Sequence, residues 1–369
     1  MSVYCDHNAG SPIRPEAAEA VVRAFAIGGN PSSVHARGRA ARKLMEDARE
    51  QVATSVGASA ENVIFTSGAT EALHLALRAV RGVAQSLVLS AIEHDALWEE
   101  APNVDLPRFV APMNGDGAVD LAALEQILAE APRPALVAVM LANNETGAVQ
   151  PIARAATLVR EAGGMLLVDA AQGLGRIPVS LADLDASYLV LSSHKIGGPQ
   201  GAGALILASG APFAITQGGG GQERGRRPGT ENVPAIVGFG VAAELAARDD
   251  AARVRALRDR FEAALLKIEP NAAIFARDAV RLPNTSLFAI PGWRAETALI
   301  ALDLEGVCAS SGAACSSGKV RASRVLTAMG VSPDLARCAL RVSFGWSSME
   351  ADVDAALNAL TKLRAREAA

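Results

Sequence analysis

Short apolar runs recur along the first two-thirds of the chain, and each is nearly continuous in apolar character. Strands buried on both faces of a mostly parallel sheet have this character, whereas strands with one wet face alternate. Segments of helical periodicity follow several of the runs, so the pattern predicts a doubly wound α/β fold. The runs cover residues 62–67, 86–94, 134–142, 165–170, 188–193 and 203–208.

Helical patterns also precede the first apolar run. Residues 15–29 predict a helix that starts at Pro15, where a proline is tolerated, and ends at glycines. Residues 33–57 predict a longer helix. The glycine-rich segment 216–233 predicts a long loop, and a loop of this length inside a compact domain is usually functional.

The composition is that of an ordinary globular protein. Half of the 369 residues are apolar, a fifth are charged, and the net charge is −4. A chain of this length usually exceeds one compact core, so we expect two domains. The expected boundaries are 15–245 for a large domain, and 1–14 together with 246–369 for a smaller α+β domain.

Charge and hydropathy exclude several classes of protein. The net charge argues against a general nucleic-acid or membrane-surface binder, and the basic cluster at 223–229 favours a loop or a clamp for a small anion. No apolar run is long enough to predict a transmembrane helix, and the first ten residues lack a signal-peptide pattern. We therefore expect a cytoplasmic protein with no nucleic-acid or membrane partner.

The cysteines give no sign of a metal or disulfide framework. Their spacing matches neither a zinc site nor a thioredoxin motif, so we expect free thiols in a reducing compartment. The four are Cys5, Cys308, Cys315 and Cys338.

Reactive side chains lie where several predicted strands end. Lys195 follows one strand and is one of only five lysines in a chain that carries most of its positive charge as arginine. Asp169 ends a second strand, His94 a third, and Thr66 with Ser67 a fourth. Ligands bind at the carboxyl ends of strands in open α/β sheets. Each residue alone is weak evidence, but together they indicate one site.

The segment TSGATEALHLAL, residues 66–77, predicts a strand end, a tight turn and a helix that opens at Ala69 and Thr70. Free N–H groups at such a start attract a phosphate, although an ordinary capped helix explains the segment equally well. The chain has no Walker A motif and no dinucleotide fingerprint. A phosphate site with a lysine and an aspartate at strand ends suggests pyridoxal phosphate, whose aldehyde forms a Schiff base with lysine.

Seven motifs extend this interpretation over nearly the whole chain. They are GNPSSVHARGRAAR (29–42), FTSGATEA (65–72), NNETG (143–147), VDAAQGLG (168–175), SSHKIGGPQGAG (192–203), GGGQERGRRPGTENV (219–233) and SSGAACSSGK (310–319). With them the sequence resembles the NifS- and IscS-like group I cysteine desulfurases, within aminotransferase class V and the fold-type I pyridoxal phosphate enzymes. The resemblance implies a mainly parallel seven-stranded sheet flanked by helices, and a smaller domain whose loop at about 308–322 carries the catalytic cysteine.

The resemblance also implies which residues hold the cofactor. Lys195 would bind pyridoxal phosphate covalently, and His94 would stack on its ring and move protons. Asp169 would pair with the ring nitrogen, and Gln172 would hydrogen-bond the phenolic oxygen. The implied phosphate ligands are Ala69, Thr70, Ser192, His194 and, from a second subunit, Thr230.

The implied substrate is L-cysteine. Asn144 and Arg341 would bind its carboxylate, which an arginine fork fits. Cys315 would take its sulfur as a persulfide and leave L-alanine, and Lys319 nearby would favour the thiolate. The implied assembly is a homodimer that passes sulfur to an iron–sulfur scaffold or another acceptor protein. No resident metal is implied beyond a transient iron–sulfur contact through Cys315.

Two other functions stay open from the sequence. An aminotransferase or a selenocysteine lyase of the same fold would not need Cys315. A binding protein that kept the fold without catalysis would show a lost Lys195 or Asp169, and both residues are present. The other three cysteines match no catalytic position, and we expect them to pack in the core.

Overall fold

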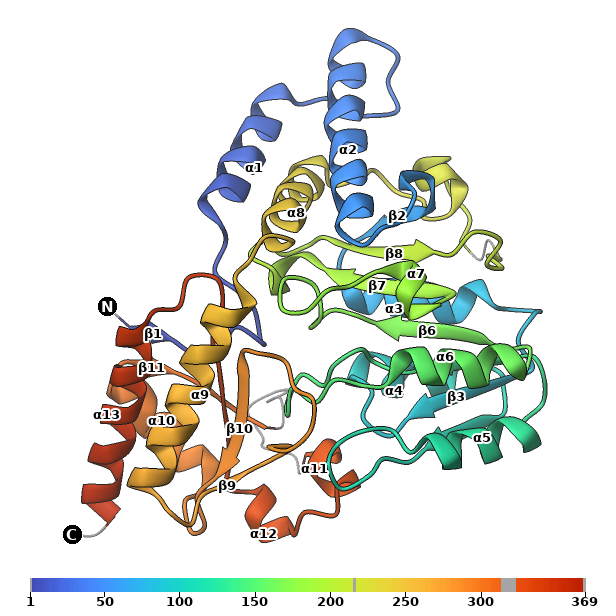
Figure 1. Cartoon of the computed structure of the whole chain (residues 1–369). Helices are drawn as coiled ribbons and strands as arrows, with labels where there is room; N and C mark the ends of the chain where they lie inside the picture. Colours follow the sequence, from blue (N-terminus) through green and yellow to red (C-terminus); the bar gives the residue numbers. More distant parts are fainter. Residues whose placement is uncertain (1, 215–216, 313–322, 368–369) are drawn as a thin grey trace.

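The computed structural model describes residues 2–214, 217–312 and 323–367. Among these residues, the largest sheet has seven strands in the order β2-β8-β7-β6-β5-β3-β4 (Figure 1). The strands are β2 (Val63–Thr66), β3 (Ser86–Ser90), β4 (Arg108–Ala111), β5 (Ala135–Ala138), β6 (Met165–Asp169), β7 (Tyr188–Ser192) and β8 (Gly203–Leu207). In this described sheet β8 runs antiparallel to both neighbours and the other pairs are parallel, which confirms the predicted mainly parallel sheet.

Six of the strands fall within the six apolar runs, and the pattern missed β4. This strand lies at an edge of the sheet, where Arg108 is exposed and the side chain of Val110 is 47% exposed. An edge strand with exposed positions has no continuous apolar run, so the criterion that found the six buried strands does not apply to it.

Helices cover both faces of the sheet. Val63 and Phe65 of β2 face one apolar cluster, and Ile64 between them faces the other, as expected for strands buried on both sides. The helices are α1 (Pro15–Ile27), α2 (Ala36–Ser55), α3 (Ala69–Ala79), α4 (Asp95–Glu100), α5 (Leu121–Glu130), α6 (Ile152–Glu161), α7 (Leu181–Leu184) and α8 (Val233–Ala246). Short 3₁₀ turns are η1 (Ala60–Asn62), η2 (Ala101–Asn103), η3 (Ser193–Lys195) and η4 (Gln222–Gly225).

The glycine-rich loop ends where α8 begins, at Val233. Inside the loop, Glu223 forms an ion pair of 2.7 Å with Arg49 of α2, and both side chains are buried. The Glu223 carboxylate also accepts a hydrogen bond from the backbone N–H of Phe65 in β2. Because a buried carboxylate requires such partners, these contacts fix the loop against the edge of the sheet.

A second group of strands and helices lies beside the sheet (Figure 1). Its four-stranded antiparallel sheet has the order β12-β13-β10-β9, and β1 pairs with β11 in parallel. Phe261 contacts both Phe288 and Phe344 within a separate apolar cluster. The elements are β1 (Val3–Tyr4), α9 (Ala251–Ile268), β9 (Ala273–Ile274), β10 (Thr285–Ala289), α10 (Ala295–Leu304), β11 (Val307–Cys308), β12 (Ser310–Ser311), α11 (Arg324–Ala328), α12 (Pro333–Ala336), β13 (Ala339–Ser343) and α13 (Glu350–Glu367). The domain boundaries at 15–245 and 246–369 stay a prediction.

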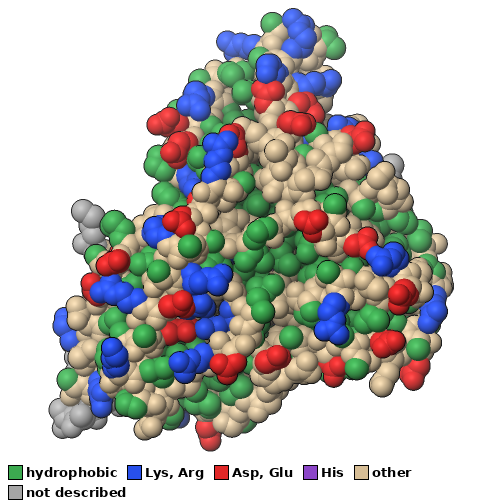
Figure 2. Space-filling view, in the orientation of Figure 1, with side chains coloured by type: hydrophobic (Ala, Val, Ile, Leu, Met, Phe, Trp, Pro, Cys, Tyr) green, Lys and Arg blue, Asp and Glu red, His purple; other side chains and the backbone are tan. Residues whose placement is uncertain are grey.

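The surface carries both signs of charge. Figure 2 shows basic and acidic side chains interspersed over one face of the molecule, in line with the net charge of −4. The longest helix in the described part of the chain, α2, is charged along its length. None of the helices within 2–214, 217–312 and 323–367 combines the length and the apolar character that a membrane crossing requires.

Candidate active site

A cavity of about 780 Å³ opens where the parallel strands end. Residues from β6, β7, the start of α3, the N-terminal segment and β13 all line it, so it lies between the large sheet and the smaller one. The cavity brings together ten of the residues that the sequence indicated: Ala69, Thr70, His94, Asn144, Asp169, Gln172, Ser192, His194, Lys195 and Arg341. The cavity therefore lies at the edge of the sheet where the carboxyl ends of the parallel strands meet, as expected for an open α/β fold.

Lys195 ends the 3₁₀ turn η3 that follows β7. Its Nζ donates to the backbone oxygens of Asn8 at 2.5 Å and Ala9 at 3.0 Å. Burial, followed by the positive charges of Arg176 and Arg341, lowers the pKa of Lys195 to about 7. A large share of this amine is therefore neutral near pH 7, and a neutral amine can attack an aldehyde.

Asp169 ends β6 and is buried at the cavity wall. Burial raises the pKa of its carboxyl group, while a hydrogen bond from the backbone N–H of Ala171 and the charges of His94 and Lys195 oppose that rise. A buried carboxyl group of this kind gains from a cationic partner, such as a protonated ring nitrogen.

His94 caps the start of α4. Its Nδ1 accepts a hydrogen bond from the backbone N–H of Ala96 at 3.0 Å. In the neutral ring the proton is thus assigned to Nε2, and the imidazole lines the same cavity as Asp169. The cap fixes one edge of the ring and leaves its face for a ligand.

The start of α3 forms one end of the cavity. The helix begins at Ala69, and its first N–H groups have no partner within the helix. Gly203 of β8 allows this approach, because a Cβ at that position would lie 2.6 Å from the backbone carbon of Gly68. With Ser192 and His194 in the same wall, the arrangement suits an anion such as a phosphate.

Arg341 of β13 reaches the cavity from the smaller sheet. Its Nη1 donates to the backbone oxygen of Asn144 at 2.9 Å, and its Nη2 donates to the carboxylate of Asp6 at 2.7 Å. The Nε is buried without a hydrogen-bond partner among the described residues. Because a guanidinium has five N–H donors, Arg341 keeps donors for the carboxylate of a bound substrate.

Sequence reasoning gave no role to Asn8, which connects both sides of the site. Its backbone oxygen accepts hydrogen bonds from Lys195 and from Gln172 Nε2, and its side chain donates to the backbone oxygen of Asn144 at 3.0 Å. The only signal was its place in the polar stretch CDHNAGSP before the first helix. Such a stretch predicts a turn but no particular contact.

The described residues leave the indicated roles of Thr230 and Cys315 untested. Thr230 is exposed on the glycine-rich loop and does not line the cavity, so its role stays a prediction. Cys315, like Lys319, lies outside the described residues. The described residues on either side, Gly312 and Ser323, both lie against Glu145, which follows Asn144 in the chain: Ser323 Oγ donates to its carboxylate at 2.6 Å.

The other cysteines are not among the residues that line the cavity. Cys5 and Cys338 are buried in apolar clusters, which agrees with the expected packing role, and Cys308 is half-buried. Burial raises the pKa of the Cys5 thiol to about 12. A thiol with so high a pKa supplies almost no thiolate near neutral pH.

The arrangement fits pyridoxal phosphate in its principal groups. The amine of Lys195 suits the aldehyde, the buried Asp169 suits the ring nitrogen, and the start of α3 suits the phosphate. The cavity volume of about 780 Å³ accommodates a cofactor together with a small amino acid.

Comparisons with known proteins agree with this geometry. The model of the family described as aminotransferase class-V matches residues 3–356. A cysteine desulfurase from Cereibacter sphaeroides is 41% identical, over 97% of this chain and 94% of that protein. An IscS-like cysteine desulfurase from Mycobacterium tuberculosis is 38% identical, over 99% and 98%. The solved structure of a NifS-like protein from Rickettsia africae ESF-5 superimposes with a TM-score of 0.92 at 34% identity, over 99% of this chain and all of that chain. This chain therefore belongs to the aminotransferase class-V family, which confirms the resemblance that its motifs indicated.

Proposed function

We propose that this protein is a cysteine desulfurase, which converts L-cysteine to L-alanine and keeps the sulfur as a persulfide on Cys315. One observation carries the proposal. A cavity that holds the lysine amine and an arginine with free donors lies next to both described ends of the segment that contains Cys315. The similarity to named cysteine desulfurases over nearly the whole chain supports the same reaction.

The cofactor is pyridoxal phosphate, on which class-V aminotransferases and NifS-like desulfurases depend. When bound, it withdraws electrons from the substrate carbons next to the amino group. We propose that Lys195 holds its aldehyde carbon, Asp169 its ring nitrogen and Gln172 its phenolic oxygen. The proposed phosphate ligands are Ala69, Thr70, Ser192 and His194.

The chain's own residues supply binding, proton transfer and the nucleophile. Arg341 and Asn144 orient the substrate carboxylate. Lys195 and His94 move protons at the substrate carbons. The Cys315 thiolate attacks the substrate sulfur, the carbon–sulfur bond breaks, and its electron pair stays with the alanyl fragment. That fragment takes a proton and leaves as L-alanine, while Cys315 retains the sulfur.

The competing function is another class-V reaction, either an aminotransferase or a selenocysteine lyase. Both would use the same amine, aspartate and phosphate cradle, so these groups do not separate the candidates. A protein nucleophile separates the candidates, because only the desulfurase reaction requires a thiolate to accept divalent sulfur.

The test is an assay of alanine and sulfide from L-cysteine with two cysteine variants. Cys315→Ala should reduce turnover by at least about 10³-fold, because it removes the nucleophile. Cys308→Ala is the matched control, since Cys308 is a half-buried thiol that does not line the cavity, and it should keep wild-type turnover. Brief exposure to L-cysteine without reductant should add one sulfur atom to the peptide that contains Cys315.

Release of alanine by Cys315→Ala at a rate near that of the wild type would contradict the proposal. A lyase without a protein nucleophile would then be the better interpretation. Location of the added sulfur on Cys308 would contradict the assignment of Cys315 in the same way.

We further propose a cytoplasmic homodimer in which Thr230 completes the phosphate site of the partner subunit. The exposure of Thr230 on a loop fixed by the Arg49–Glu223 ion pair supports this role. The persulfide would pass to an iron–sulfur scaffold or another sulfur-acceptor protein.

A further inference from the structure

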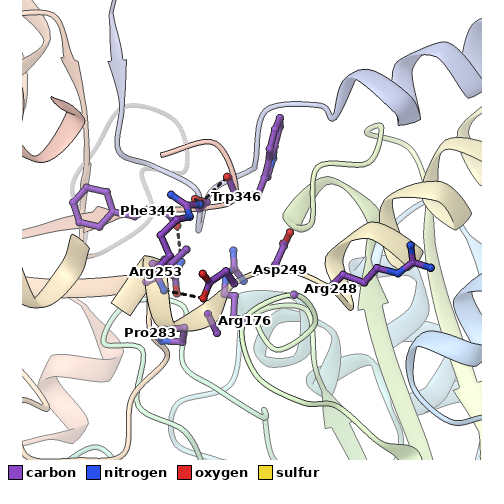
Figure 3. A pocket seen from close by; sticks show the side chains of 13 residues that line it. Arg176, Arg248, Asp249, Arg253, Pro283, Phe344 and Trp346 are labelled. Atoms are coloured by element: carbon purple, nitrogen blue, oxygen red, sulfur yellow. Dashed lines mark hydrogen bonds between the residues drawn. The ribbon is translucent and has the colours of Figure 1, made fainter. Parts of the chain in front are cut away.

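Arg176 lies behind the active site, four residues after Gln172, and its side chain is almost wholly buried. Figure 3 shows it at a second, smaller cavity, of about 190 Å³, together with Asp249 and Arg253. The acceptors described for its guanidinium are carbonyl oxygens: Gln172 O at 2.9 Å, Gln172 Oε1 at 2.6 Å, His7 O at 3.1 Å and Lys195 O at 3.4 Å. Arg176 therefore connects three segments that carry site residues.

The contact with Gln172 decides which way its amide points. A guanidinium only donates hydrogen bonds, so the amide oxygen of Gln172 must face Arg176. The amide nitrogen is then on the other side, where one of its hydrogens goes to Asn8 O at 2.9 Å. Its second hydrogen is left for a group in the cavity that Gln172 lines.

The contacts with the backbone hold the lysine and its acceptors together. Nη2 of Arg176 donates to the backbone oxygens of His7 and Lys195. The residues that accept from Lys195 Nζ, Asn8 and Ala9, directly follow His7. One guanidinium thus joins the turn that carries the amine to the segment on which the amine rests.

We propose that Arg176 is a positioning residue, which keeps the Gln172 amide nitrogen toward the cavity and fixes the Lys195 turn from behind. The inference deepens the proposed function and rests on it, because that function gives Gln172 and Lys195 their roles toward the cofactor. A neutral side chain at this position would remove the donor that holds the amide oxygen and would leave only the bond to Asn8 to orient the amide, so its nitrogen would be held less firmly toward the phenolic oxygen.

The charge of Arg176 acts on Lys195 as well. After burial, it is the largest influence that lowers the pKa of Lys195. Arg341 acts in the same direction, the negative Asp6 and Asp169 act in the opposite direction, and the neighbouring His194 has its own pKa lowered to about 4 by burial. Loss of the Arg176 charge should therefore favour the ammonium form of Lys195.

The first experiment uses protein from which the cofactor has been removed. The rate at which an acylating reagent modifies Lys195 is measured against pH by peptide mapping, which gives its pKa without any activity assay. Arg176→Met should raise this pKa by about one unit, whereas Arg176→Lys, which keeps the charge, should leave it near the wild-type value. Arg248→Met is the matched control: Arg248 lines the same smaller cavity but is exposed and bonded to Glu244, so the pKa should not move.

The second experiment uses protein loaded with pyridoxal phosphate and records its visible absorption band. Gln172→Ala defines the band in the absence of the bond to the phenolic oxygen. Arg176→Met should shift the band toward that reference, and Arg248→Met should not. Arg176→Lys should also shift it, because one ammonium nitrogen cannot hold Gln172, His7 and Lys195 together; this variant carries the test if Arg176→Met does not fold.

An unchanged Lys195 pKa in Arg176→Met, or a wild-type band in both Arg176 variants, would overturn the inference. Failure of the proposed function would look different. In that case Cys315→Ala would release alanine at a rate near that of the wild type, while the labelling experiment would still report the effect of Arg176 on the pKa of Lys195.

Discussion

At the scale of single residues, the acidity of Lys195 is set by its surroundings and not by its sequence neighbours. Burial and two arginines lower its pKa from an ordinary value of 10.5 to about 7. A lowered pKa means that protonation opposes folding. The free energy of unfolding is therefore highest above about pH 10.5, where the amine is neutral in both states. It decreases as the pH falls, because the unfolded chain takes up the proton first, and it reaches its lower level below about pH 7, where the folded protein is protonated as well.

The lowered pKa predicts how the protein without cofactor takes up pyridoxal phosphate. Covalent uptake should accelerate as pH rises through about 7 and then level off, because only the neutral amine attacks the aldehyde. Absorption of the bound cofactor against time at a series of pH values measures this rate. Lys195→Ala should show no covalent uptake, and a midpoint near pH 10 in the wild type would show that the amine is not perturbed.

At the scale of elements, the start of α11 is held to the large sheet. Ser323 caps this helix by accepting from the N–H of Leu326 at 3.0 Å, and it donates to Glu145 at 2.6 Å. Burial raises the pKa of Glu145 to about 7, although the bond from Ser323 opposes that rise. One hydroxyl group thus caps a helix of the smaller unit and satisfies a buried carboxyl group beside the cavity.

Removal of this hydroxyl group should cost stability. Ser323→Ala should lower the free energy of unfolding by about 2 kcal/mol, because it removes a helix cap and a partner of a buried carboxyl group. Ser332→Ala is the matched control, since Ser332 caps α12 through a longer bond of 3.4 Å at the surface, and it should cost no more than about 0.5 kcal/mol. Urea unfolding of both variants measures the difference, and equal losses would contradict the role of Glu145.

At the scale of the whole molecule, the proposed dimer would draw each active site from two chains. Lys195 lies in the cavity of its own chain, whereas Thr230 is exposed outside it. Exposed apolar side chains on and near α1 offer surface for a second copy: Val22 is 67% exposed, Phe25 69% and Val34 87%. Large apolar side chains gathered on a surface favour association.

A shared site predicts that two inactive variants restore each other. Lys195→Ala and Thr230→Ala chains, unfolded and refolded together in equal amounts, should recover about one quarter of the wild-type sites, because half of the dimers are mixed and each has one intact site. Turnover of L-cysteine before and after mixing measures the recovery. No gain on mixing, or an active monomer in sedimentation, would exclude the shared site.

The sequence predicted well what depends on neighbouring residues. Continuous apolar runs located six strands, and the helix starts at Pro15 and Ala69 followed from proline and from the small-residue turn. Residues at strand ends, such as Asp169 and Lys195, were found because parallel strands end at one edge. The edge strand β4 was missed, since its half-exposed side chains follow no buried pattern.

Periodicity and the residues at strand ends determined the α/β class and the site, and the resemblance of the motifs indicated the family, because each is recorded in the order of residues along the chain. Only the tertiary structure decided that Asn8 accepts a hydrogen bond from Lys195 and that Arg176 donates to the backbone oxygen of His7. These contacts join segments far apart in the chain, so no local pattern encodes them. The lowered pKa of Lys195 has the same origin: desolvation and the fields of distant charges exist only once the layers have packed.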